Sequence, residues 1–194
     1  MRKPQNLLEK YQLDKQTHCP VRFMLFDPRT NAVKKTIERS NLILYGAADI
    51  LAQLIAGNAD YKINAMYIEF ENTGGPPVIP PAFDRSGGRA YYDGLGAGKD
   101  YLRVPILVSP ALSASGVAYQ NNQATFFAVT EGVAGVHGTT FDITSVVYGA
   151  ALVAAPDIGD QSQDIVFSRV YTEIGSIQKE VGHEVGVTWT IGFQ

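Results

Sequence analysis

The sequence predicts an all-β protein with one short helix, folded as a β-sandwich or jelly-roll-like domain. Nineteen glycines and ten prolines among 194 residues are typical of a chain with many turns. Ten tyrosines and nine phenylalanines favour strands, where flat side chains pack across their neighbours. From residue 101 onward, several segments alternate apolar and polar residues between turn-rich connections. That pattern is typical of two packed sheets.

The chain divides into an arm and one domain. Residues 1–20 show no sustained hydrophobic period and contain Pro4 and Pro20, so we expect an extended arm that becomes ordered only against a partner. The remaining residues, 21–194, are enough to bury one sizeable core. We therefore expect a single β-sandwich domain after the arm.

A hairpin is predicted at the start of the domain. Residues 21–26 and 32–39 are strand-like and flank a turn that contains Pro28, which favours the second position of a β-turn. Alternation along the second strand predicts that Val33 and Ile37 point inward.

Residues 41–71 predict a helix followed by a strand. Apolar residues recur at i, i+3, i+4, i+7 and i+8, so they form one stripe, which we expect to lie in the core: Ala47, Ile50, Leu51, Leu54 and Ile55. Gly57 followed by Asn58 predicts the end of the helix. The period then becomes two, which predicts a half-buried strand. Its inward face carries Met66, Ile68 and Phe70, and its outward face Tyr67, Glu69 and Glu71.

A long glycine- and proline-rich loop is predicted over residues 72–100. Loops of this length usually serve a partner or ligand, and paired prolines stiffen such a loop. The alternative is that the loop folds back over its own sheet. Aromatic and arginine side chains anchor interfaces, so the candidate partner-binding residues in the arm and the loop are Arg2, Lys3, Lys10, Lys15, Phe83, Arg85, Arg89, Tyr91 and Tyr92.

Further strands are predicted after the loop. They cover residues 102–108, 119–130, 141–155, 165–174 and 184–193. Pro105 removes a ladder donor, which indicates an edge strand for the first of them. The last strand alternates most regularly and directs Val185, Val187, Trp189, Ile191 and Phe193 inward.

The charge is distributed unevenly along the chain. Residues 1–39 carry nine Lys and Arg against four acids, and the rest carries seven against fifteen, with no Lys or Arg between Arg103 and Arg169. A basic end on an acidic body is able to contact a second copy or another acidic surface; the alternative is a solvated basic tail. The acidic body argues against nucleic-acid binding, and no apolar run reaches the roughly 20 residues that span a bilayer.

Catalytic, metal and cofactor motifs are not found in the sequence. His18, His137 and His183 are far apart and form no ligand pair. The glycines at 94–98 precede a predicted strand, whereas a phosphate-binding loop opens a helix. Asp157, Asp160 and Asp164 do not match a calcium-loop spacing and predict a solvated turn. We expect no enzyme, no cofactor and no small-molecule substrate.

One stretch resembles a pattern found in structural proteins of tailed-bacteriophage virions. In that pattern an N-L-I or N-L-V strand end precedes a short helix that reads roughly G-x-x-x-L-A-x-L-x-A-G, and an aromatic-rich strand follows. The matching residues are Asn41, Leu42, Ile43, Gly46, Ile50, Leu51, Ala52, Leu54, Ala56 and Gly57, then 63–70. The likeness covers about 30 of 194 residues and departs after Phe70, where a long loop replaces a short glycine turn.

The resemblance implies virion assembly rather than catalysis. Among such proteins, capsid cement (decoration) proteins are similar in size, are often compact β domains, and tie neighbouring capsid subunits through arms and loops, commonly as homotrimers. The implied partners are the major capsid protein and further copies of this chain, and the implied location is the capsid surface after synthesis in the host cytoplasm. The alternatives are a phage tail, baseplate or adaptor protein, or a carbohydrate-binding β-sandwich that uses Tyr91, Tyr92 and Tyr119 beside the polar residues 121–123.

Overall fold

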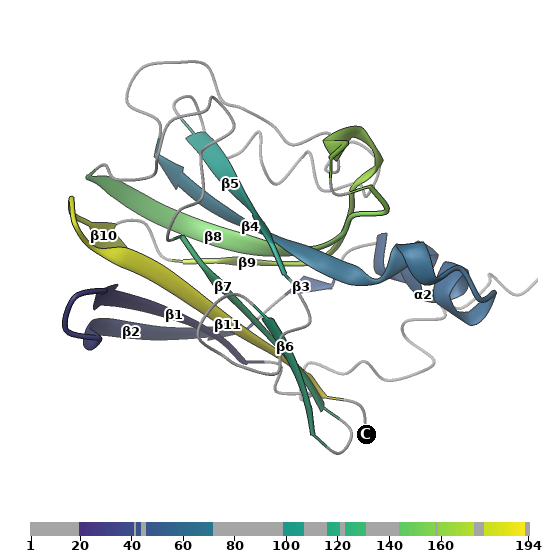
Figure 1. Ribbon diagram of the computed structural model, residues 1–194, viewed down its shortest axis with the longest axis horizontal. Coiled ribbons are helices and arrows are strands. Elements are labelled where there is room, and N and C mark those ends of the chain that lie inside the picture. Colours follow the sequence, from purple (N-terminus) through teal and green to yellow (C-terminus); the bar gives the residue numbers. More distant parts are fainter. Residues whose placement is uncertain are drawn as a thin grey trace, which may run out of the picture.

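The protein consists of two antiparallel sheets packed face to face (Figure 1). The computed structural model describes residues 20–40, 42–43, 46–71, 99–106, 116–120, 123–130, 144–157, 159–172 and 177–192. The five-stranded sheet has the order β2 (Ala32–Ser40), β1 (Pro20–Asp27), β11 (Glu184–Gly192), β7 (Gln123–Val129) and β6 (Gly116–Gln120). The predicted β-sandwich is confirmed.

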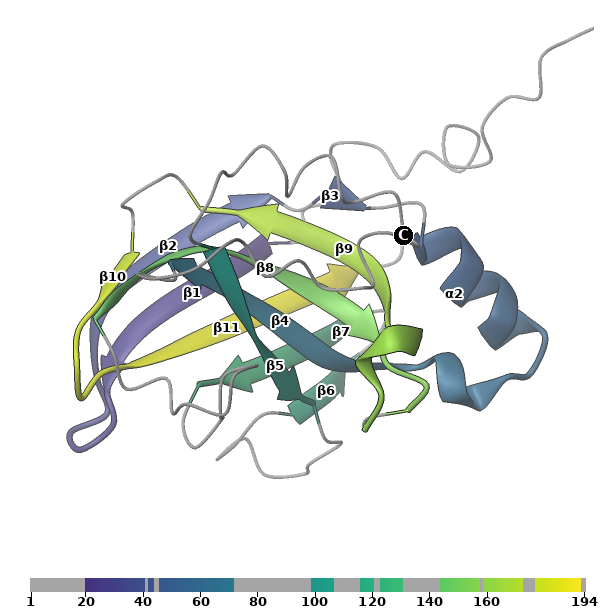
Figure 2. The same cartoon turned by 90° about the horizontal axis from the view of Figure 1, so that it is seen from above.

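The second sheet has six strands among the described residues. Its order is β3 (Leu42–Ile43), β9 (Ile165–Tyr171), β8 (Ser145–Ala154), β4 (Ile63–Glu71) and β5 (Lys99–Pro105), and β10 (Ile177–Lys179) pairs with β8 beyond the end of β9. Figure 2 shows the two sheets stacked. β5 lies at the edge of its sheet, as Pro105 predicted.

The predicted hairpin is formed by β1 and β2. Asp27 accepts a hydrogen bond from the Arg29 amide at 2.9 Å, and Asn31 takes the left-handed conformation that the tight turn requires. The prediction for Val33 is wrong, because its side chain is 56% exposed. The register shifts between Leu25 and Phe26, and this bulge moves Val33 to the outer face.

The predicted helix is α2 (Gly46–Ile55). Its end is a Schellman motif: the Asn58 amide donates to the Gln53 carbonyl and the Gly57 amide to the Leu54 carbonyl, both at 3.0 Å. Gly57 has φ +87°, which a residue with a Cβ adopts only under strain. Of the helices in the described part of the chain, none has the length and apolarity to cross a membrane.

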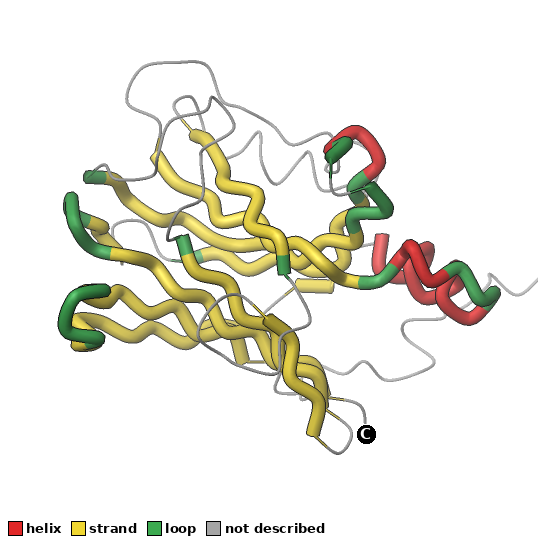
Figure 3. Tube along the Cα trace, in the orientation of Figure 1, coloured by secondary structure: helices red, strands yellow, loops and turns green. Residues whose placement is uncertain are grey.

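The helical segments lie at one end of the sandwich. Figure 3 shows α2, η1 (Ala59–Tyr61) and η2 (Gln161–Gln163) gathered there, while strands and the loops and turns between them make up the rest of the described chain. α2 packs on β9. This end therefore differs in secondary structure from the opposite end, where the β1–β2 turn lies.

β4 is more deeply buried than the sequence predicted. Met66, Ile68 and Phe70 face the core between the sheets, as expected, but Tyr67 and Glu69 on the other face are also buried. Strand β8, which pairs with β4 and β9 on its two edges, is buried along nearly its whole length. The small residues of β8 are typical of a strand that is buried on both faces.

The last strands complete the core. Val185, Val187, Trp189 and Ile191 of β11 are buried, as predicted, and β11 occupies the centre of its sheet. The prediction of one strand over 119–130 is wrong, because β6 and β7 form a hairpin in this region. The predicted strand 165–174 is shorter in the structure and β10, which was not predicted, follows it.

Candidate functional site

The nine side chains predicted to bind partners lie outside the described residues. They are Arg2, Lys3, Lys10, Lys15, Phe83, Arg85, Arg89, Tyr91 and Tyr92. The loop residues 72–98 lie outside the described residues as well, and so do His18, Cys19 and His137. The candidate sites below come from other parts of the chain.

An apolar surface is formed by α2. Only Gly46, Ala47 and Ile50 of this helix are buried. The prediction that the whole stripe lies in the core is wrong for Leu51, Leu54 and Ile55, which are 37%, 39% and 86% exposed. We call these three residues the α2 apolar face. The helix sits at the end of the sandwich, so only its first two turns reach the core. The rest of the apolar stripe lies outside the core.

A cavity of about 110 Å³ lies beside the α2 apolar face. Its walls include Ile50, Leu51 and Leu54 of the helix. Both sheets contribute the remaining walls, with Phe126 and Ile191 from the five-stranded sheet and Phe167 from the six-stranded one. Every residue that lines the cavity is apolar. Shape and chemistry therefore suit an aliphatic group.

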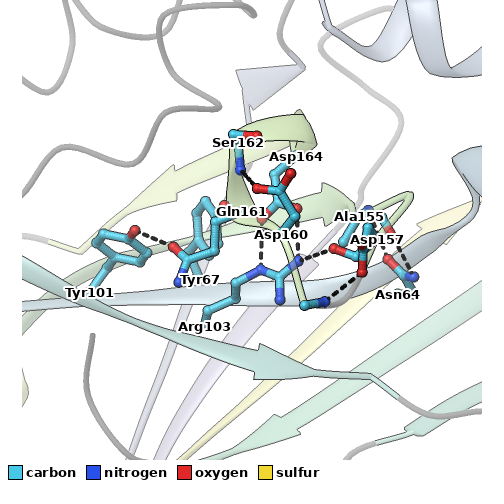
Figure 4. A network of polar contacts seen from close by, with 11 residues as sticks. Asn64, Tyr67, Tyr101, Arg103, Ala155, Asp157, Asp160, Gln161, Ser162 and Asp164 are labelled. Atoms are coloured by element: carbon cyan, nitrogen blue, oxygen red, sulfur yellow. Dashed lines mark hydrogen bonds and ion pairs between the residues drawn. The ribbon is translucent and has the colours of Figure 1, made fainter. Parts of the chain in front are cut away.

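A polar network joins β4, β5 and the segment before β9 (Figure 4). Arg103 donates from Nε and Nη2 to the two carboxylate oxygens of Asp164, at 2.7 and 2.8 Å. The Tyr67 hydroxyl donates to the same carboxylate, and the Tyr101 hydroxyl donates to the Gln161 side chain at 2.5 Å. Asp164 is fully buried. These residues are satisfied by one another, and the network cross-links three segments of the chain.

Burial determines how the tyrosines of this network titrate. Burial, together with the nearby Asp164 carboxylate, raises the pKa of Tyr101 to about 12. The same two causes, in the same order, raise the pKa of Tyr67. Both hydroxyls therefore remain protonated at neutral pH and serve as hydrogen-bond donors.

A second buried pair joins β9 to β4. Arg169 Nε donates to Glu69 Oε1 at 2.9 Å and Nη2 donates to Oε2. The guanidinium also donates to the Tyr171 hydroxyl and lies 4.1 Å from the centre of that ring. Burial raises the pKa of Glu69, and the Arg169 charge partly opposes this. A paired and buried carboxylate of this kind is typical of a structural ion pair.

The aspartates between β8 and β9 divide into two kinds. Asp157 accepts from the Gly159 amide at 2.8 Å, and Asp160 caps η2 through the Ser162 amide at 2.9 Å. The turn hydrogen bonds from Ser162 lower the pKa of Asp160. For Asp164 the prediction of a solvated turn is wrong, because its carboxylate is buried against Arg103. Within the described ranges, no group of three His, Cys, Asp or Glu residues is placed to hold a metal ion.

Sequence reasoning missed both buried networks, although one signal was present. Arg103 and Arg169 bracket the long stretch without Lys or Arg. Arg103 lies between Leu102 and Val104, and Arg169 is followed by Val170 and Tyr171. Isolated arginines in such strands indicate buried partners.

Comparison with known protein families, with curated proteins and with solved structures finds no match.

Proposed function

We propose that this protein is a non-enzymatic structural component of a tailed-bacteriophage virion, and a capsid cement protein in particular. The observation that carries the proposal is the α2 apolar face, which groups three exposed apolar side chains at one end of the sandwich. Leu51, Leu54 and Ile55 are adjacent on the helix surface. Exposed apolar patches of this kind mark protein interaction sites.

The basic hairpin supports the same proposal. Residues 20–40 carry five basic side chains against two acidic ones, and the exposed strand β2 presents Lys34 and Lys35. Residues 40–194 carry seven Lys and Arg against fifteen Asp and Glu. A hairpin of this charge is suited to contact an acidic neighbouring subunit, including a second copy of this chain.

The buried ion pairs support a mechanical role. Arg103–Asp164 and Arg169–Glu69 connect strands across the six-stranded sheet, which gives a body suited to transmit force between its contacts. In a closed shell, many modest contacts act together, so stabilisation of the particle exceeds that of a single interface. The sequence resemblance at 41–70 is the reason to place this function in a virion.

The proposal is tested with particles that lack the protein. Adding purified wild-type protein should restore the resistance of the shell to heat. This resistance is measured as the temperature at which the particles release their genome. Ile55→Asp should weaken binding to the shell, because it places a charge in the contact. Val33→Asn is the matched control, since Val33 is also exposed, lies near the opposite end of the sandwich, and the change leaves the charge of the basic hairpin unaltered.

Two outcomes would contradict the proposal. One is that particles without the protein resist heat as well as complete particles do. The other is that cryo-electron microscopy of complete particles finds the protein in a ring on the tail, which would assign it to the tail, baseplate or adaptor class. We expect trimers on the shell.

A further inference from the structure

We propose that strand β2 is a docking edge, at which an extended acidic segment of the shell subunit adds to the five-stranded sheet as one more strand. This inference rests on the proposed function and deepens it, because it gives the binding mode and the partner chemistry of the basic hairpin. It uses a surface separate from the α2 apolar face.

The outer edge of β2 is long and exposed. β2 is the last strand of its sheet and, among the described strands, forms a ladder with β1 alone. It has nine residues, whereas the mean strand has about 5–6. Residues 32–36 are exposed without interruption. An antiparallel strand directs alternate amide and carbonyl groups to each side, so this edge presents main-chain groups that a further strand is able to bind.

The charge of β2 selects an acidic segment. Lys34 and Lys35 are exposed and adjacent, at the point where the register of the hairpin shifts. Glu38, the one carboxylate of β2, accepts from Arg22 Nε at 2.9 Å, so its charge is offset by β1 and not by the lysines. Opposite charges on neighbouring strands stabilise their pairing, and like charges oppose it.

Edge lysines also have a protective role in β proteins. A lysine keeps neutral or basic strands away from an open edge, because pairing would remove its charge from water. An acidic strand offsets this penalty, since it supplies the opposite charge. The same lysines therefore exclude most strands and admit one class of partner.

The described edge strands of a second copy do not supply an acidic strand. β6 and β3 contain no charged residue, and β10 contains one lysine. β5 carries Lys99 and Arg103 against Asp100, and a second β2 carries three cations against Glu38. Charge therefore favours a strand from a different protein, and the proposed function makes that protein the shell subunit.

Peptide binding to the purified protein tests the docking edge. The probe has the length of β2, nine residues, alternates threonine with glutamate and has blocked ends. A comparison peptide has glutamine in place of every glutamate. We expect the acidic peptide to change the NMR chemical shifts of the β2 amides, and the glutamine peptide to bind about tenfold more weakly.

A matched pair of variants tests the role of the lysines. Lys35→Gln should weaken binding of the acidic peptide about threefold, because one cross-strand charge pair is lost. Lys62→Gln is the control, since it removes an exposed lysine next to η1 and should leave the affinity unchanged. Equal effects of the two variants would overturn the proposal.

Main-chain methylation separates strand pairing from charge attraction alone. Two acidic peptides carry the same number of N-methyl groups, placed in one at alternate residues, which blocks a single edge, and in the other on both edges. The first should bind like the unmodified peptide, and the second at least about tenfold more weakly, because its amides no longer donate to β2. Equal affinities of these two peptides would overturn the proposal, and so would absence of binding by the unmodified acidic peptide.

The remaining outcome concerns the source of the strand. Dimerisation of the purified protein that Lys35→Gln abolishes would assign the edge to a second copy and overturn the choice of the shell subunit. The peptide measurements are independent of the particle test. Heat protection without peptide binding would therefore remove this inference and leave the proposed function in place.

Discussion

Arg169 and Glu69 are 100 residues apart in the sequence and form a bidentate ion pair in the interior, each with 1% of its side chain exposed. The pair crosses the central strand β8, which lies between β9 and β4. Gly149 of β8 is the ladder partner of Glu69. A Cβ at this position would lie 2.3 Å from the Val170 carbonyl oxygen and 3.4 Å from Glu69 Oε2. The glycine therefore allows the close approach of β9 and leaves room for the carboxylate.

Removal of one partner of this pair should be strongly destabilising. Arg169→Met leaves the Glu69 carboxylate buried without its cation, which costs about 3–5 kcal/mol. The double variant Arg169→Met with Glu69→Leu should recover much of the loss, because neither charge is then buried. Urea unfolding monitored by circular dichroism measures both free energies.

The exposed pair Arg22–Glu38 is the matched control. Both side chains are about half exposed, and Arg22 Nη2 lies 2.6 Å from Glu38 Oε1. Arg22→Met should cost only about 0–1 kcal/mol, since water screens the pair. Equal costs at the two sites would show that Arg169 and Glu69 are solvated in the folded protein.

Gly149→Ala should destabilise the six-stranded sheet. The added methyl group meets the backbone of β9, so the strands must separate, and overpacking of this kind costs about 1–3 kcal/mol. Gly57→Ala provides a comparison in which no atom lies within 4 Å of the added methyl group, and the cost comes from backbone strain alone. Thermal unfolding of both variants measures the difference. Native stability of Gly149→Ala would contradict the packing described for β8 and β9.

Trp189→Ala should cost about 3–5 kcal/mol, because Trp189 is fully buried in the central strand of its sheet. Its indole Nε1 has no hydrogen-bond acceptor in the described part of the chain. Trp189→Phe therefore loses no such bond and should cost much less than the alanine variant. Chemical unfolding followed by circular dichroism provides the values. A cost near zero for Trp189→Ala would place the side chain on an exposed face.

Stability should fall at alkaline pH because of the buried tyrosines. The folded pKa of Tyr101 is about 12, whereas an unfolded tyrosine has a pKa of about 10. The folded state therefore holds its proton where the unfolded state loses it, so the free energy of unfolding decreases as pH rises from about 10 to 12. Tyr101→Phe should reduce this pH dependence. Unfolding curves recorded across that range test it, and an unchanged slope in Tyr101→Phe would contradict the shift.

The sequence alone predicted the features that depend on local backbone geometry. The alternation of Val185, Val187 and Trp189 identified a strand and its inward face, and the Gly57–Asn58 pair identified the end of the helix. Pro105 marked an edge strand, because a missing amide is a property of the residue itself. Glycine and aromatic content predicted the β class, because glycine favours turns and aromatic side chains favour strands.

Tertiary structure decided which segments meet and how deeply each is buried. Periodicity gives the face on which a side chain lies, but the strand opposite that face depends on the packing of the whole chain. The sequence therefore could not pair Glu69 with Arg169 or Tyr67 with Asp164. A single bulge in the β1–β2 hairpin reversed the face of Val33. The position of α2 at the end of the sandwich left half of a regular apolar stripe outside the core, because a helix buries only the part of its stripe that another element covers.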